Sequence, residues 1–483
     1  MSRMTIPRWS GHRVWSAGFS PQDRPSAKGR SCALKTASCA RFMVTEHGRK
    51  DEVTSHEPQT LTPSLSRRTG EGGPLCGTGE GECARFMVPM RIKPLHVNAA
   101  PMNTRYGGIL FVATGLSLLL VTSALAADPP PADATAAWLA EHYTKYEHRI
   151  SMRDGVRLFT RIYVPKDDSQ AWPIVLTRTP YALKPYGADN YTDPAGSFET
   201  LAKDSFILVT QDVRGRFASE GEYVHVRPFN PAKAGIDTDE SSDTWDTIDW
   251  LVNNVPGHNG NVGLFGISYP GFYTSMGMID SHPALKAASP QAPIADWFMG
   301  DDVHHNGAFF LSQNFDFFYW LAQRADDPRH EEIKRFHFGT PDGYDFFLRM
   351  GPLANSDAVL LKGRSPIWTE LLQHPTYDAF WQARNIRPHL KNVRCAVMTV
   401  GGWFDAEDLF GPLETYRWTE RQNPGITNVL VMGPWAHGDW GRASGERLGA
   451  ISFRAKTSEF YREKIELPFF RHFLKGDTNY APV

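Results

Sequence analysis

Short apolar runs alternate with helical patterns between about residues 147 and 478. Such runs, bounded by turn residues, are typical of strands buried on both faces of a parallel sheet. The pattern predicts a hairpin of residues 149–152 and 156–163 around Asp154-Gly155. Further strands are expected at 174–177, 206–211, 262–265, 285–289, 395–400 and 428–432, and helices at 242–253, 272–279 and 457–475. Strands alternating with helices indicate an α/β fold with right-handed crossover connections.

Residues 296–392 lack strand patterns and interrupt the predicted sheet. We interpret them as a helical cap inserted between two parts of one sheet domain, residues 147–295 and 393–478. The chain has 14 Trp and 29 Phe, and many of them fall between residues 297 and 382. This density fits a cap that lines a pocket for aromatic or other apolar side chains. Packing in an ordinary core would use the same residues.

A serine follows the strand at 262–265 in Gly266-Ile267-Ser268-Tyr269-Pro270-Gly271, and an apolar helix comes next. A serine on a tight strand-to-helix turn presents its hydroxyl above the sheet edge, and the next backbone N–H can face an oxyanion. The second glycine comes one residue later than in the usual G-x-S-x-G pattern. A purely structural turn therefore remains an alternative reading of this segment alone.

Two further residues follow Ser268 in the order that α/β-hydrolases use, an acid and then a histidine. Asp405 comes just after the apolar run 395–400, and His437 just after the run 428–432. Catalytic groups collect at this end of the strands in open α/β sheets. Asp405 could instead cap a helix, and His437 could be an ordinary loop residue. The three positions in order favour a catalytic triad.

Five motifs together make the chain resemble the serine hydrolase group of α-amino acid ester hydrolase, cocaine esterase and X-Pro dipeptidyl-peptidase, and the first of these most. They are Arg178-Thr179-Pro180-Tyr181, Gln211-Asp212-Val213-Arg214-Gly215, Gly266-Ile267-Ser268-Tyr269-Pro270-Gly271, Gly402-Trp403-Phe404-Asp405 and Gly433-Pro434-Trp435-Ala436-His437. The resemblance runs from about Tyr146 to about Asp477. It implies an α/β-hydrolase fold with an inserted helical cap. The serine turn of this family has the same glycine spacing as residues 266–271.

The resemblance also implies a role for each catalytic residue. Ser268 would be the nucleophile, His437 the general base and then acid, and Asp405 the residue that orients His437. The backbone N–H of Tyr269 and the hydroxyl of Tyr181 would form the oxyanion hole, since a tyrosine O–H stays protonated near neutral pH. Without the resemblance, Tyr181 would be read as anchoring a loop beside Pro180.

Three carboxylates would bind a substrate's free α-amino group in the α-amino acid ester hydrolase branch. They carry over to Asp302, Glu407 and Asp408. An ammonium that leaves water needs charge-assisted hydrogen bonds, and crowded carboxylates repel, so one of them can hold a proton. The alternative is that these acids belong to the first turns of helices, where the macrodipole favours them. Pro270 stands where the resemblance leads us to expect an acid.

These observations predict a serine hydrolase that cleaves esters or amides of α-amino acids through an acyl-enzyme on Ser268. The resemblance extends this to acyl transfer to β-lactam amines. The alternatives are a general esterase or acylase of the cocaine-esterase or glutaryl-acylase kind, an X-Pro dipeptidyl-peptidase, and an inactive scaffold. We expect no cofactor and no metal, because no histidine and cysteine spacing fits a zinc site. The near-neutral charge of −2 and the absence of a basic stripe argue against nucleic acid.

The sequence patterns of the first 126 residues concern the start of translation and export, not the folded domain. Residues 1–101 are polar, aperiodic and expected to be disordered, with four of the five cysteines (Cys32, Cys39, Cys76 and Cys83). Residues 102–126 resemble a secretory signal peptide, with a short basic start, an apolar core too short for a span and an A-x-A end. We therefore expect translation from Met102, and a periplasmic or secreted enzyme with no membrane contact after cleavage.

The remaining expectations concern the flanks of the domain. Residues 127–146 are expected to form a Pro/Ala-rich arm, which is a possible contact in a homo-oligomer that the resemblance makes plausible. Cys395 is read as a buried strand residue. Residues 479–483 are expected to start a C-terminal jelly-roll domain that the family usually has and that is missing from this sequence.

Overall fold

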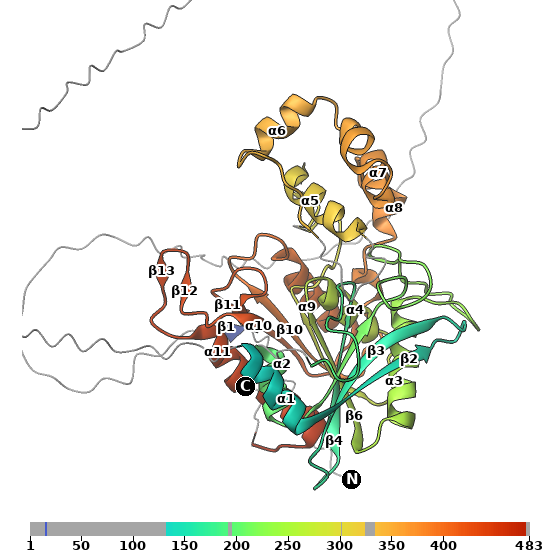
Figure 1. Cartoon of the computed structure of the whole chain (residues 1–483), viewed down its shortest axis with the longest axis vertical. Coiled ribbons are helices and arrows are strands. Elements are labelled where there is room, and N and C mark those ends of the chain that lie inside the picture. Colours follow the sequence, from blue (N-terminus) through green and yellow to red (C-terminus); the bar gives the residue numbers. More distant parts are fainter. Residues whose placement is uncertain (1–14, 17–131, 192–195, 301, 324–333, 480–483) are drawn as a thin grey trace, which may run out of the picture. The chain divides into compact units, whose positions relative to one another are not determined.

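The computed structural model describes residues 15–16, 132–191, 196–300, 302–323 and 334–479 (Figure 1). Nearly all of the predicted extension at 1–101, the predicted signal peptide at 102–126 and the four N-terminal cysteines lie outside these residues. Among the described helices, none combines the length and the apolar character that crossing a bilayer requires.

A nine-stranded, mostly parallel sheet forms the centre of the described domain, in the order β1-β11-β10-β7-β6-β4-β5-β3-β2. Its strands are β1 (Trp15–Ser16), β2 (Tyr143–Ser151), β3 (Arg157–Pro165), β4 (Trp172–Thr179), β5 (Ile207–Asp212), β6 (His258–Ile267), β7 (Leu285–Gln291), β10 (Ala396–Gly402) and β11 (Asn428–Gly433). The β2–β3 hairpin and the β3–β5 pair are antiparallel, and the other pairs are parallel. Every strand predicted from the apolar runs is present, mostly longer than predicted.

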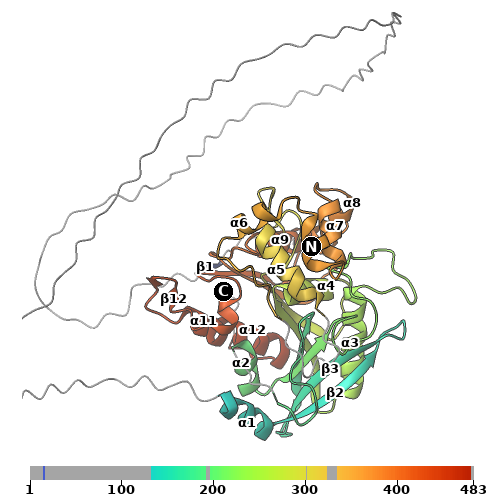
Figure 2. The same ribbon diagram turned by 45° about the horizontal axis from the view of Figure 1, so that its top comes forward.

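Alternate strand residues pack against helices on opposite faces of the sheet. In β4, Ile174 and Leu176 belong to the cluster that includes α3 (Glu240–Asn254) and α4 (Tyr269–Gly277), whereas Val175 belongs to the opposite cluster. On the first face α9 (Phe410–Gln422) packs on β10 and β11. The second face is covered by α1 (Ala132–His142), α2 (Ser197–Lys203) and a C-terminal helical segment of α11 (Thr457–Tyr461), η3 (Arg462–Glu466), α12 (Leu467–Phe470) and η4 (Arg471–Lys475) (Figure 2).

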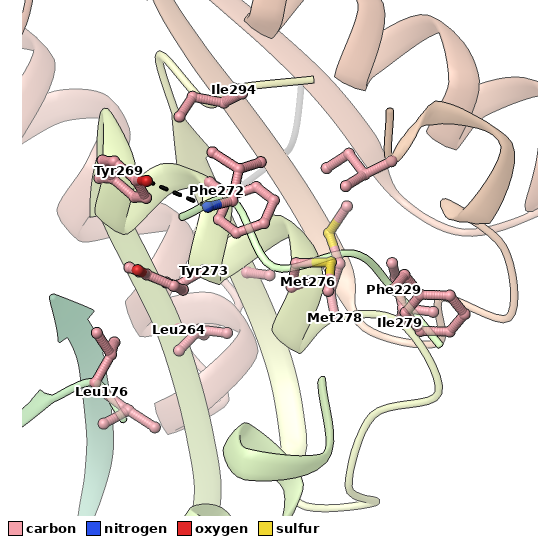
Figure 3. Packing of buried hydrophobic residues seen from close by; sticks show 14 of the residues in the cluster. Leu176, Phe229, Leu264, Tyr269, Phe272, Tyr273, Met276, Met278, Ile279 and Ile294 are labelled. Atoms are coloured by element: carbon pink, nitrogen blue, oxygen red, sulfur yellow. Dashed lines mark hydrogen bonds between the residues drawn. The ribbon is translucent and has the colours of Figure 1, made fainter. Parts of the chain in front are cut away.

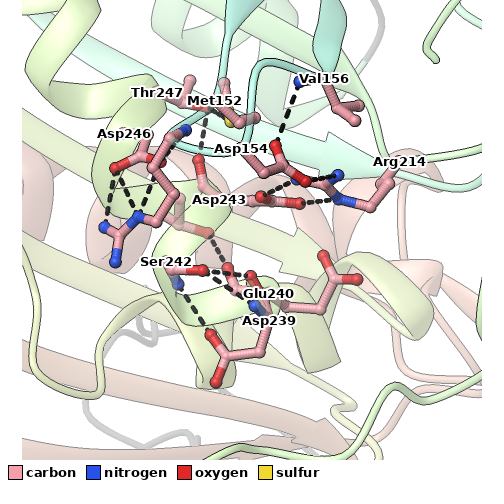
Figure 4. A network of polar contacts seen from close by, with 12 residues as sticks. Met152, Asp154, Val156, Arg214, Asp239, Glu240, Ser242, Asp243, Asp246 and Thr247 are labelled. Carbon is pink, nitrogen blue, oxygen red and sulfur yellow. Dashed lines mark hydrogen bonds and ion pairs between the residues drawn. The ribbon is translucent and has the colours of Figure 1, made fainter. Parts of the chain in front are cut away.

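A buried network of charges fastens the predicted hairpin turn to α3 (Figure 4). Arg214 lies between two carboxylates, with Nη1 2.6 Å from Asp154 and Nη2 2.7 Å from Asp243. The start of α3 is closed by a capping box, in which Asp239 and Ser242 each accept a backbone N–H of the other at 2.9 Å. These bonds fix the loop after β5 on the helix that follows it.

The segment between β7 and β10 forms the cap, which stands above one end of the sheet in Figure 1. It contains α5 (Leu311–Ala322), α6 (Gly343–Met350), α7 (Pro366–Gln373) and α8 (Ala379–Gln382), with the short turns η1 (Ser356–Leu361) and η2 (Arg387–His389). Two two-residue strands, β8 (His304–His305) and β9 (Ala308–Phe309), also occur here, where the sequence shows no strand pattern. They form only an isolated ribbon, too short to leave a period in the sequence.

Several other predictions differ from the structure in detail. The arm at 127–146, for which no helix was predicted, contains α1 and the start of β2. Its alanines are strong helix formers, which outweighs the prolines that precede them. The predicted helix 457–475 is present but alternates between α and wider turns. Cys395 is 2% exposed and lies one residue before β10, so it is buried as predicted.

Three small elements complete the described fold: α10 (Asp439–Arg442), β12 (Arg447–Leu448) and β13 (Ile451–Ser452).

Candidate active site

Ser268 occupies a strained elbow between β6 and α4. Its φ of 69° and ψ of −126° lie in a region that a residue with a Cβ rarely adopts. Its N–H donates to the Gln291 carbonyl at 2.9 Å, and its own carbonyl accepts the Phe272 N–H at 3.0 Å. These two bonds hold the strained residue between the end of β7 and the first turn of α4, so the elbow is specified by its surroundings.

The two glycines of the elbow are required by close backbone approaches. A Cβ at position 271 would lie 2.4 Å from the Gln291 carbonyl oxygen, and a Cβ at position 266 would lie 2.5 Å from Pro270. Gly271 therefore lets α4 approach the end of β7. This explains the spacing that differs from G-x-S-x-G, because the second close contact falls one residue later. Pro270 sits in the first turn of α4, where its missing N–H costs nothing.

Asp405 and His437 come from the loops after the adjacent strands β10 and β11. The His437 Nδ1–H donates to Asp405 Oδ2 at 2.9 Å, and the Asp405 side chain is buried. The second oxygen, Oδ1, accepts the N–H groups of Glu407 at 2.8 Å and Asp408 at 2.9 Å. The alternative role of Asp405 as a helix cap does not apply, because α9 begins only at Phe410. The turn that Asp405 closes instead fixes its carboxylate toward His437.

The surroundings of His437 favour its protonated form. Burial lowers the pKa of this imidazole, but the hydrogen bond and the charge of Asp405, with the charges of Glu407 and Asp302, raise it above its ordinary value of 6.5 overall. The Nε2 atom lies 3.4 Å from Glu407 Oε2. His437 also lines the same cavity as Ser268. The pair can therefore hold a proton taken from a group in that cavity.

A pH profile follows from this shift. A general base must be neutral, so kcat/KM for a simple acyl ester should rise with pH through the pKa of His437, and the midpoint of that limb should lie above 6.5. Phenylacetic acid methyl ester is the appropriate substrate because it carries no titrating amine. Asp405→Asn should move the midpoint of the residual activity to lower pH, since the hydrogen bond to Asp405 raises the pKa. A wild-type midpoint at or below 6.5 would contradict this assignment.

The two predicted oxyanion residues, Tyr181 and Tyr269, line the same cavity as Ser268. Tyr181 lies two residues beyond β4, and the side chain of Ser268 interacts with the Tyr181 hydroxyl. Burial raises the pKa of Tyr181 well above its usual range, so the hydroxyl keeps its proton. The Tyr269 ring turns into the core, where its oxygen accepts the Val226 N–H at 3.2 Å (Figure 3). This leaves the backbone N–H, and not the hydroxyl, as the group of Tyr269 that could act as an oxyanion donor.

Asp302 and Asp408 form a carboxyl pair beside the triad, in which Asp408 is buried and Asp302 is partly buried at the cavity wall. Burial and the facing carboxyl of Asp302 raise the pKa of Asp408 well above its usual range. Burial also raises the pKa of Asp302, to about 7, although its hydrogen bond with Asp408 opposes this. The Asp408 Oδ2 atom is buried and meets no donor among the described residues. A proton on Asp408, given to Asp302, satisfies both side chains at neutral pH.

The third predicted acid, Glu407, is half-exposed and lines the cavity beside His437. Asp302 lines the cavity with it, whereas Asp408 stands behind. Neither Glu407 nor Asp408 belongs to a helix, since both precede α9. The alternative in which these acids simply open a helix is therefore wrong. All three predicted carboxyls gather near His437, although Asp302 is more than a hundred residues away in sequence.

The cavity over Ser268 has a volume of about 770 Å³ and is closed on one side by α5 of the cap. Its walls include Trp297, Phe317, Phe318 and Trp320, so the aromatic-rich segment does line a pocket. Several polar lining residues were missed from the sequence: Gln313, Asn314, Asp316, Arg335 and Arg442. The sequence does contain one indication of this wall. Residues four and then three positions apart lie on one face of a helix, as do Gln313, Phe317 and Trp320.

No group of three or more His, Cys, Asp or Glu side chains within the described ranges is arranged to hold a metal ion.

The strand order and the constellation around Ser268 define an α/β-hydrolase with the site of a serine hydrolase. The sequence profile of the family described as X-Pro dipeptidyl-peptidase (S15 family) matches residues 154–439, which is more than half of the chain. The protein belongs to this family. The family resemblance predicted from the five motifs is confirmed.

Three relatives show how the similarity is distributed. The chain is 25% identical over 343 residues to a cocaine esterase of Rhodococcus sp. (strain MB1 Bresler), covering 68% of this chain and 55% of that protein. The solved aminopeptidase from a marine sediment archaeon (Thaumarchaeota archaeon) is 36% identical, with a TM-score of 0.64, over 70% of this chain and 56% of that one. A solved α-amino acid ester hydrolase is 34% identical, with a TM-score of 0.64, over 75% and 59%. The chain thus spans somewhat more than half the length of these relatives.

Proposed function

We propose that the protein hydrolyses esters or amides of α-amino acids that carry a free amino group, through an acyl-enzyme on Ser268. The observation that carries the proposal is the carboxyl pair Asp302–Asp408 beside the His437–Asp405 pair. A hydrolase needs only the serine, histidine and aspartate, whereas the proton shared by Asp302 and Asp408 can be replaced by a cationic ligand that pairs with the carboxylates. Two relatives with the highest identities above are called an aminopeptidase and an α-amino acid ester hydrolase, which is consistent with such a ligand.

The residues around Ser268 supply each step of acyl transfer. His437 Nε2 takes the Ser268 Oγ proton as Oγ attacks the substrate carbonyl carbon, and the oxyanion forms opposite Tyr181 and the Tyr269 N–H. The tetrahedral intermediate collapses, the bond to the alcohol or amine breaks, and His437 gives its proton to that leaving group. Water then attacks the acyl-enzyme, passes a proton to His437 and releases the acid, and Ser268 regains its proton.

The ammonium of the substrate replaces the proton shared by the two acids. An arriving cation stabilises the ionised form of both Asp302 and Asp408, and its N–H groups donate charge-assisted hydrogen bonds to Asp302 and Glu407. The same carboxylates attract the amino group to the side of the cavity next to His437. The aromatic wall formed by Trp297, Phe317 and Phe318 fits an apolar or aromatic side chain on the acyl group.

Other acceptors and substrates are variations of the same acyl-enzyme. An amine can take the place of water, so transfer to a β-lactam amine is a proposed extension. A general esterase activity, as in the relative called a cocaine esterase, would need no acid pair. We also propose that the enzyme is periplasmic or secreted, because residues 102–126 resemble a signal peptide.

The carboxyls can be tested with two esters that differ only in the amino group. We expect Asp302→Asn and Glu407→Gln to raise KM for phenylglycine methyl ester by about ten- to a hundredfold, because each removes a charge-assisted hydrogen bond. KM for phenylacetic acid methyl ester should change by less than about threefold. Asp316→Asn is the matched control, because Asp316 lines the same cavity but is paired with Arg335 at 3.1 Å. Equal losses on both esters would contradict an ammonium site and leave the hydrolase assignment intact.

A further inference from the structure

Arg216 connects the predicted oxyanion loop to the cap. It follows β5 in the loop Asp212-Val213-Arg214-Gly215-Arg216 and is only 5% exposed. Its Nε–H donates to the carbonyl of Pro180 at 3.0 Å, and its Nη1–H donates to the carbonyl of Leu321 at 2.9 Å. Pro180 directly precedes Tyr181, and Leu321 is in the last turn of α5. One side chain therefore joins the two walls of the active-site cavity.

The partners of Arg216 are unusual for a buried arginine. Within the part of the chain that the structure describes, no carboxylate lies at ion-pair distance from it. Its guanidinium instead lies over the rings of Phe217, 4.7 Å from the centroid, and Tyr223, 5.1 Å away. Arg214, two residues earlier, is held between two carboxylates. Burial lowers the pKa of Arg216, so this placement is costly. The charge of Asp212 acts on Arg216 from a longer distance, so a buried guanidinium with no ion pair among the described residues has to be compensated by what its hydrogen bonds hold in place.

Both ends of this connection lead to residues that face the substrate. On the loop side, the Tyr181 N–H donates to Thr179 Oγ1 at 3.1 Å, so the backbone around Tyr181 is fixed at two neighbouring points. On the cap side, α5 contributes Phe317 and Trp320 to the cavity wall. The rings of Tyr181 and Trp320 also meet, with centroids 5.3 Å apart. A shift of α5 would therefore be transmitted to the Tyr181 hydroxyl.

We propose that Arg216 is a positioning residue that sets the Tyr181 hydroxyl toward Ser268 by fastening the Tyr181 loop to cap helix α5. The proposal rests on the proposed function, because it gives Tyr181 the role of oxyanion donor. The planar guanidinium is suited to this position, since its donors point in fixed directions and can reach two carbonyls at once. A lysine keeps the charge but offers a single point of contact, so it should not replace Arg216.

The test is a double-mutant cycle between Arg216 and Tyr181, measured as kcat on phenylglycine methyl ester. Removing an oxyanion donor costs about 10²–10³ in kcat, so Tyr181→Phe should fall in this range. We expect Arg216→Met and Arg216→Lys each to lower kcat by about tenfold or more in the wild-type background. In the Tyr181→Phe background the same changes should lower kcat by less than about twofold, because the hydroxyl that Arg216 positions is already absent.

Arg384 provides the matched control. It also joins the cap to the rest of the domain, because its Nε–H donates to the carbonyl of His225 at 3.3 Å while its Nη1–H donates within the cap to the carbonyl of Phe380 at 2.9 Å, but it does not touch Pro180. Arg384→Lys should therefore combine additively with Tyr181→Phe. Each variant is checked by its Tm, and Arg216→Lys, which retains the charge, serves if Arg216→Met does not fold.

The outcomes separate the two proposals. Additive losses for Arg216 and Tyr181 would show a role in general stability and would overturn the positioning role. No loss of kcat in Tyr181→Phe alone would overturn the oxyanion role of Tyr181, which belongs to the proposed function. A large loss for Arg216→Lys that disappears in the Tyr181→Phe background would support both.

Discussion

Replacing Ser268 by alanine should lower kcat for an amino acid ester by about 10⁶, the size of loss seen when the nucleophile of a serine hydrolase is removed. The hydroxyl is the atom that becomes acylated, and no neighbouring group can take its place at the elbow. The strained backbone of Ser268 presents that hydroxyl to the cavity that His437 lines. Because alanine fits the same turn as well as serine, the loss should come without a comparable fall in Tm.

A second serine in the same cavity provides the control. Ser197 also lines it, but it lies at the start of α2 and not on the elbow. Ser197→Ala should therefore keep kcat within about an order of magnitude of the wild type. A fluorophosphonate probe should label the wild type and Ser197→Ala at Ser268, and it should not label Ser268→Ala. A wild-type protein that resists the probe would support the alternative of an inactive scaffold.

Replacing Asp405 by asparagine should lower kcat by about 10⁴, because the amide can present its N–H to His437 and hold the imidazole in the wrong tautomer. Asp405 Oδ2 accepts the His437 Nδ1–H at 2.9 Å, which leaves Nε2 as the basic nitrogen. The loss should be in kcat more than in KM, since Asp405 does not touch the substrate. Both kcat and KM should be measured on phenylacetic acid methyl ester. This ester has no amino group, so the proposed ammonium site at Asp302 and Glu407 does not affect the comparison.

Asp439 is the matched acid for this experiment. It lies two residues after His437, at the start of α10, and has no hydrogen bond to the imidazole. Asp439→Asn should leave kcat nearly unchanged. A fall of less than tenfold in Asp405→Asn would contradict the assignment of Asp405, and Glu407, 3.4 Å from His437 Nε2, would then be the acid to examine.

Much of the fold was predictable because the central strands of this sheet, such as β4, β5 and β10, are buried on both faces. Such strands appear as uninterrupted apolar runs, and the groups just past their ends converge at one edge of the sheet. Ser268, Asp405 and His437 could therefore be placed together without any contact information. The elbow spacing could be explained only with the structure, because it depends on the approach of Gly271 to the Gln291 carbonyl.

The cap and its contribution to the site were less predictable. Asp302 and Asp408 lie in two loops that are far apart in sequence. No periodic pattern of residues near either one indicates that they pair, and only the family resemblance suggested it. Arg216 left no local signal either, because its partners are the carbonyls of Pro180 and Leu321, and any residue supplies a carbonyl. Helix α1 was missed because its few turns follow a run of prolines.

The most direct test of the account is kcat/KM of the wild-type chain on phenylglycine methyl ester and phenylacetic acid methyl ester, which differ only by the α-amino group. The triad and the carboxyls of Asp302, Glu407 and Asp408 together predict a preference for the amino ester of at least about tenfold. Equal values for the two esters would contradict the ammonium site and leave a general esterase, and a preference for phenylacetic acid methyl ester would contradict it most strongly.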